Sequence, residues 1–217
     1  MMALVALLAG SCKKSTVDVS PLASLNVTNV VVGGKTVKLN SNLVDSATNY
    51  NYKAFGINPG NTNIYVYPTG DSTHPYYNQT VQTGNSGVYS LFLAGNVATQ
   101  VDTIFALEAI PVRTDSSCGV RFANLSYNSG PILVTQSASP TVVEFGLSYK
   151  QISIFKTYPA LSNNGTYTFQ VRDAGTNTIL ATYALTTPRF FNCTLVWKGM
   201  KGGTGTNVPG VLRVNNY

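Results

Sequence analysis

The stretch Tyr89-Ser90-Leu91-Phe92-Leu93-Ala94-Gly95 recurs as Cys193-Thr194-Leu195-Val196-Trp197-Lys198-Gly199. In both copies alternate residues face the same way and a glycine follows, which is typical of a β-strand that ends at a turn. A second pattern, apolar-x-apolar-x-Asn, occurs at Leu25–Asn29, Val120–Asn124 and Leu212–Asn216, with its asparagines 95 and 92 positions apart. Two modules of about 95 residues account for both repeats.

The remainder of the chain divides into short apolar or β-branched runs separated by turn-forming residues. Strands are predicted at 25–32, 35–39, 50–55, 63–67, 76–81, 88–93 and 103–112, and then at 132–135, 141–147, 151–156, 167–172, 179–185, 190–198 and 211–215. Gly33-Gly34 predicts a two-residue hairpin turn between the first two strands. The copy at 212–216 is expected to close the second module, as the copy at 120–124 would close the first.

No apolar pattern keeps a helical period, so the predicted fold class is all-β. Seven or so short strands per module favour two tandem immunoglobulin-like β-sandwiches, over residues 24–118 and 119–217.

The first residues resemble a bacterial lipoprotein signal. A short apolar run, Ala3–Ala9, is followed by Gly10, Ser11, Cys12 and then two lysines. The run is too short to span a bilayer, and small residues before a cysteine fit a lipobox of the Bacteroidetes type. The prediction is a signal peptide at 1–11, lipid on Cys12 and a flexible tether over 12–23, with a buried strand carrying an incidental cysteine as the alternative.

Composition indicates an exported protein that does not bind nucleic acid. Charged residues make up 10% of the chain, and the net charge of +6 is dispersed, with no basic run longer than Lys13-Lys14. Such a distribution lacks the clustered footprint of nucleic-acid binding. Cys118 and Cys193 form an even pair after Cys12, so they are a candidate disulfide; the alternative is two unpaired, buried thiols.

Titratable groups that could form a catalytic site are few. His74 is the one histidine and falls in a predicted loop, and the two glutamates, Glu108 and Glu144, belong to different modules. No nucleophile elbow, phosphate loop or Cys/His metal cluster occurs, so we expect no enzyme activity, metal or cofactor.

Thirteen tyrosines favour binding over catalysis. Tyr65 and Tyr67 share a strand face and Tyr76-Tyr77 follows nearby, which predicts a ligand platform, with cross-strand packing as the alternative. Trp197 shares a face with Cys193 and Leu195 and is predicted to be core. Three Asp-Ser/Thr-x triplets make Ser46, Ser72 and Thr103 candidate O-glycosylation sites.

The repeat unit resembles domain of unknown function 4397, a bacterial lipoprotein module. Residues 121–126 followed by Gly130-Pro131 are similar to its opening strand and turn, and residues 88–95 are similar to its later strand ending in glycine. Tyr127 and Asn128 replace the Pro-Asp of that turn, and the first module lacks the turn motif.

That resemblance implies an exported, often lipid-anchored β-sandwich and assigns no active residues. Together these features predict an outer-membrane lipoprotein that acts as a non-enzymatic binding or adhesion module for an extracellular glycan or protein. A glycan-binding accessory of a polysaccharide-uptake system and a structural envelope spacer are the alternatives.

Overall fold

The protein, described by a computed structural model over residues 22–40, 42–161, 165–186 and 189–216, contains sixteen β-strands in four four-stranded sheets. The predicted all-β class is confirmed. Cys12, the apolar run before it and the predicted tether as far as residue 21 lie outside the described residues.

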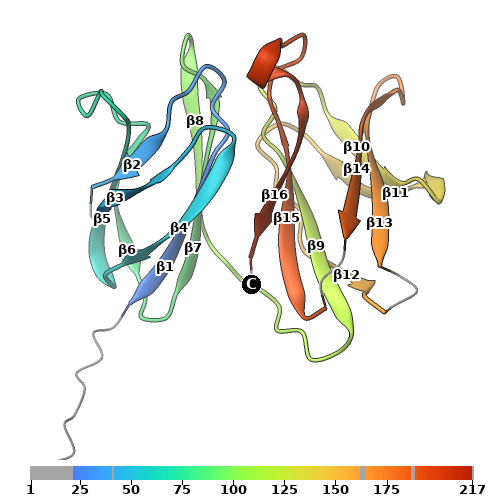
Figure 1. Cartoon of the computed structure of the whole chain (residues 1–217), viewed down its shortest axis with the longest axis horizontal. Coiled ribbons are helices and arrows are strands. Elements are labelled where there is room, and N and C mark those ends of the chain that lie inside the picture. Colours follow the sequence, from blue (N-terminus) through green and yellow to red (C-terminus); the bar gives the residue numbers. More distant parts are fainter. Residues whose placement is uncertain (1–21, 41, 162–164, 187–188, 217) are drawn as a thin grey trace, which may run out of the picture.

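Each half of the chain forms one sandwich of two sheets (Figure 1). In module one the inner sheet has the order β4 (Asn51–Ile57), β1 (Ala23–Asn29), β7 (Val88–Asn96), β8 (Gln100–Leu107), and the outer sheet the order β3 (Asn42–Ala47), β2 (Val37–Leu39), β5 (Gly60–Pro68), β6 (Tyr77–Thr83). In module two the inner order is β12 (Lys156–Pro159), β9 (Ser117–Asn124), β15 (Phe191–Lys198), β16 (Gly210–Asn215), and the outer order is β11 (Ser139–Leu147), β10 (Ile132–Gln136), β13 (Thr166–Asp173), β14 (Ile179–Thr186).

The two modules repeat the same topology strand for strand. In each, the first strand pairs antiparallel with one neighbour and parallel with the seventh strand, β1 with β7 and β9 with β15. If the eight strands of each module are lettered A to H in chain order, the two sheets have the orders D-A-G-H and C-B-E-F. An immunoglobulin constant domain instead has the sheets A-B-E-D and C-F-G. The sandwich architecture is as predicted, with a strand order of its own.

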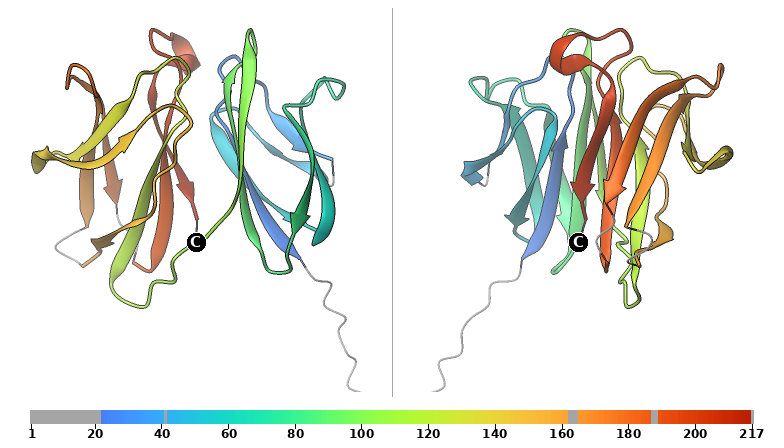
Figure 2. Two further views of the ribbon diagram at one scale, coloured as in Figure 1. Left: turned by 180° about the vertical axis from the view of Figure 1, so that it is seen from behind. Right: turned by 45° about the vertical axis from the view of Figure 1, so that its right-hand side comes forward.

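The two inner sheets face each other across a third core (Figure 2). Side chains from both modules meet there: Val30, Phe92 and Ala94 from module one, and Ala123, Leu125, Val196 and Val214 from module two. The central strands of the inner sheets, β1, β7, β9 and β15, are therefore largely buried on both faces, and all eight residues of β9 are buried. Outer strands such as β5 alternate between less and more exposed positions, as a half-solvated sheet requires.

Polar contacts also cross between the modules. The Asp102 carboxylate accepts hydrogen bonds from the Tyr149 hydroxyl (2.8 Å) and the Lys150 ammonium (2.9 Å). The Tyr50 hydroxyl donates to Asn207 Oδ1 at 2.6 Å, and the Lys198 ammonium lies 4.2 Å from the centre of the Tyr50 ring. The modules are thus joined by polar contacts as well as by the third core.

Five expectations about individual strands and boundaries are wrong, and one strand was missed. Gly33-Gly34 is not a hairpin turn, because β1 and β2 belong to different sheets and both edges of β1 are already paired with β4 and β7. The copy at Val120–Asn124 opens module two as β9 rather than closing module one, and the predicted boundary at 118/119 consequently falls inside β9.

The other two concern strand extents. The predicted strand 151–156 is reduced to a single bridge at Ile152 before β12, because the Ser153 hydroxyl accepts the Phe122 N–H and occupies a position in the ladder. The strand predicted to run to 112 ends at Leu107, and β3 was not predicted.

Candidate functional site

The repeated asparagine holds the same link in both modules. In module two the buried Asn124 side chain donates from Nδ2 to the carbonyls of Gly130 (3.4 Å) and Leu147 (3.2 Å). Asn29 makes the equivalent bonds to the carbonyls of Lys35 (2.9 Å) and Ala47 (3.4 Å). Each asparagine therefore fixes the link between the first two strands against the end of the third strand.

The glycine that ends each repeated strand accepts a hydrogen bond from the same link. Gly95 and Gly199 have φ of +82° and +97°, and their carbonyls accept the N–H groups of Val32 (2.9 Å) and Tyr127 (2.8 Å). Glycine adopts positive φ far more readily than other residues, which explains why this residue ends both strands.

These constraints produce a cavity of about 240 Å³ at one end of module two, which we call the module-two pocket. Its walls come from the β9–β10 link with Ile132, the end of β13 at Asp173, Leu180 near the start of β14, Trp197, and the β15–β16 link. We call this the apical end; it carries the short 3₁₀ helix η2 (Gly205–Asn207), and β1 begins at the opposite, basal end (Figure 1).

Module one has a cavity of about 250 Å³ in the corresponding place, the module-one pocket. It is formed by Gly33 and Lys35 in the β1–β2 link, Pro68 at the end of β5, residues leading into β6, and Val97 in the β7–β8 link. The equivalent segments thus create a hollow at the apical end of both modules.

The two pockets differ in chemistry. The module-one pocket contains Lys35, Asp71, His74 and Tyr76, and His74 Nδ1 lies 3.0 Å from the Asp71 carboxylate. Hydrogen bonds from Thr73 and His74 lower the pKa of Asp71 below its ordinary value. The module-two pocket is mostly apolar, with Ile132, Leu180, Val208 and two prolines beside Trp197.

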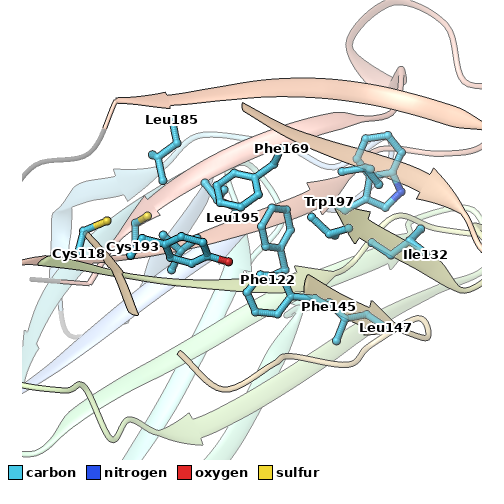
Figure 3. Close-up of a cluster of buried hydrophobic side chains, with 14 of the residues drawn as sticks. Cys118, Phe122, Ile132, Phe145, Leu147, Phe169, Leu185, Cys193, Leu195 and Trp197 are labelled. Carbon is cyan, nitrogen blue, oxygen red and sulfur yellow. The ribbon is translucent and has the colours of Figure 1, made fainter. Parts of the chain in front are cut away.

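Trp197 combines core packing with an unused hydrogen-bond donor. Its ring is 1% exposed and belongs to the main core of module two, as predicted (Figure 3). Its Nε1 is buried and has no hydrogen-bond partner among the described residues. Sequence reasoning assigned Trp197 to the core and missed that the same residue also lines a pocket.

The four predicted platform tyrosines do not form one surface. Tyr65 and Tyr67 lie on the outer face of β5 with ring centroids 5.8 Å apart, and the Tyr65 hydroxyl donates to the Ser72 carbonyl. Tyr77 is paired with the buried Val66, so it is on the opposite face, where it stacks on Phe105. Tyr76 packs against the module-one core and lines the module-one pocket. Only Tyr65 and Tyr67 remain as a surface pair.

The predicted disulfide is wrong, because Cys118 and Cys193 are both free and buried. Cys118 is opposite Phe191 in the parallel ladder and Cys193 is opposite Val120, so the cysteines are offset by two positions. An offset of about 6.6 Å along the strands adds to the lateral spacing of about 4.8 Å, which exceeds the Cα separation that a disulfide spans. Burial raises the pKa of both thiols, that of Cys193 to about 12.

The two glutamates are engaged in separate ion pairs. Both Glu108 oxygens accept hydrogen bonds from the Arg121 guanidinium, at 2.6 and 2.8 Å. Glu144 accepts bonds from Gln136, Lys156 and Tyr158. The structure therefore does not bring them together.

The candidate glycosylation residues differ in accessibility. Ser72 and Thr103 are exposed, the first between β5 and β6 and the second in β8, whereas Ser46 is half-buried in β3. Neither a helix able to cross a membrane nor a group of three or more potential metal ligands occurs in the part of the chain that the structure describes.

No protein-family model matches the chain, and no curated protein shows significant sequence similarity to it. The resemblance to domain of unknown function 4397 stays a prediction.

Proposed function

We propose that the protein is a lipid-anchored envelope protein, held through Cys12, that acts as a non-enzymatic binding or adhesion module. The observation that supports this most strongly is the paired arrangement of hollows, one at the apical end of each module. Because β1 begins at the basal end, an anchor preceding it would leave the apical end directed away from the membrane (Figure 1).

Family membership is part of the same proposal. Asn124 and Gly95 lie in the two segments that resemble domain of unknown function 4397, and they have the same structural roles as Asn29 and Gly199 in the other module. Their structural roles support a shared module architecture.

The proposal is tested by protease shaving of intact cells that express the full chain, beside a Cys12→Ala variant. We expect cleavage on intact cells and release of the variant from the outer-membrane fraction. Protection until the outer membrane is opened would contradict surface exposure and leave a periplasmic spacer or assembly partner. Retention of the variant in the membrane would contradict the lipid anchor.

A second candidate function, glycan binding for polysaccharide uptake, is favoured by the pair Tyr65 and Tyr67. Neighbouring rings on an outer sheet face can contact a sugar while their hydroxyls stay in water. Retention of the full chain on a polysaccharide affinity gel, lost in Tyr67→Ala and kept in Asn61→Ala on the same strand, would support it. Equal retention of both variants would count against it.

A further inference from the structure

The module-two pocket holds a donor that the fold leaves unpaired. The indole N–H can donate one hydrogen bond and accept none, and Trp197 makes no such bond to any described residue. Leaving a buried donor unsatisfied costs about 1–3 kcal/mol, so a partner from outside the described chain would be stabilising. In the view of Figure 3 the indole nitrogen is on the side of the ring nearest Ile132, which lines the same pocket.

The size of the pocket limits what that partner is. A dry cavity of about 150 Å³ accommodates benzene. At about 240 Å³, the module-two pocket has room for one six-membered ring with a small substituent.

The walls of the pocket limit its chemistry. Ile132, Leu180 and Val208 would leave most sugar hydroxyls without partners, and burying unpaired hydroxyls is unfavourable. Asp173 and Lys201 also line the pocket and have opposite charges, so the site has no net preference for an anion or a cation. The walls therefore favour an uncharged, largely apolar ring.

We propose that the module-two pocket binds a small, uncharged, single-ring compound whose carbonyl or ether oxygen accepts the Trp197 indole N–H. This inference deepens the proposed binding function by giving one module a ligand class. The module-one pocket, with Asp71, His74 and Lys35, is not expected to bind the same compounds.

The test uses two ligands of nearly the same shape, cyclohexanone and methylenecyclohexane, of which only the ketone has an acceptor. Since Trp197 is the one tryptophan in the chain, its indole N–H gives a single identifiable NMR signal in the full-length protein. We expect cyclohexanone to move that proton downfield and to saturate, and methylenecyclohexane to bind without the downfield shift. An unchanged indole signal up to the solubility limit of the ketone would overturn the proposal.

Trp197→Phe separates the hydrogen bond from the shape of the cavity. Affinities from ligand-observed NMR should show the ketone losing about three- to tenfold more than the hydrocarbon, because one hydrogen bond is lost with the ketone alone. Equal losses for both ligands would contradict the assigned hydrogen bond.

Gly130→Phe and Gly56→Phe provide a matched pair for the pocket itself. Both glycines have ordinary φ and open space for a side chain, but only Gly130 lines the pocket. We expect Gly130→Phe to abolish the cyclohexanone response and Gly56→Phe to keep it. A response lost in both, or in neither, would place binding elsewhere. None of these measurements depends on Cys12, so their failure and that of the anchoring experiment are distinguishable.

Discussion

Asn29 and Asn124 show how one side chain can specify a repeat. Each is fully buried at the end of the first strand of its module. It donates to two carbonyls, one in the link between the first two strands and one at the end of the third strand. In module two, Ser129 also donates to Asn124 Oδ1 at 3.1 Å, while Asn29 Oδ1 has no partner among the described residues. The repeated asparagine thus has more of its hydrogen-bonding groups paired in the second module.

Replacing Asn124 by alanine should lower the free energy of unfolding by about 1–3 kcal/mol, because the Leu147 and Gly130 carbonyls, the first of them in a buried hydrogen bond, lose their donor. Urea denaturation of the full chain measures this. Asn61→Ala, at an exposed position in β5, should change stability by no more than about 0.5 kcal/mol. Equal effects of the two changes would contradict a specific role for Asn124.

Cys118 and Cys193 should react with a thiol reagent at pH 8 only after the protein is unfolded. Both are buried, and burial raises the pKa of each above its usual value, to about 12 for Cys193. Mass spectrometry after labelling checks this, and rapid labelling of the native protein would contradict it.

The raised pKa of Cys193 in the folded state also affects stability. The contribution to stability that is present below about pH 9 is lost progressively as the pH rises toward 12. Urea denaturation at pH 7.5 and 10 checks this.

Among the elements, the inner strands were easiest to predict from sequence. The β7 and β15 segments repeat with a terminal glycine, and both form strands at the predicted place. The hairpin predicted at Gly33-Gly34 is wrong because a turn has the same local sequence signal whether the chain returns to its own sheet or crosses to the other one. Residues 151–156 misled because a serine hydroxyl can replace a backbone group in a ladder, which periodicity does not reveal.

The module-two pocket could not be predicted from sequence in the same way. Its lining residues are drawn from segments between Ser126 and Pro209 that only the folded topology brings together. The signals present in the sequence are the motif over residues 121–131 that resembles an opening strand and turn, and a lone Trp197 predicted to be core. The turn is found at Ser126–Ser129, and Trp197 is in the core.

Gly95→Ala should destabilise the protein by about 1–3 kcal/mol, since an alanine would be held at positive φ. Its Cβ would also clash with the Gln100 carbonyl oxygen. Gly56→Ala, in β4 with open space around it, is the matched control and should have little effect. Thermal unfolding followed by circular dichroism distinguishes them, and a neutral Gly95→Ala would contradict the strained geometry.

The whole molecule depends on contacts between its modules. Arg121 of β9 is buried, and its guanidinium is held by Glu108, which immediately follows β8, by the Thr194 hydroxyl and by the ring of Phe155, whose centroid is 4.6 Å away. Next to this ion pair, the third core buries apolar groups from both inner sheets. The modules should therefore unfold in one transition.

Removing one partner of the Glu108–Arg121 pair, whose side chains are 3% and 10% exposed, should cost about 3–5 kcal/mol, because the other charge stays buried. Glu108→Leu and Arg121→Met separately should each show this loss in urea denaturation. The double variant should recover a large part of it, since no unpaired charge remains. Additive losses in the double variant would contradict a direct pairing.

The packing of β16 against the other half of the molecule affects how the protein is made. Synthesis proceeds from the amino end, and domains generally fold in that order. A chain that has emerged only as far as β15 lacks Val214, which β16 contributes to the third core, so that core is still incomplete. The apolar interface between the modules would thus stay incomplete until the last strand arrives, and in that interval chaperones and proteases have access to it.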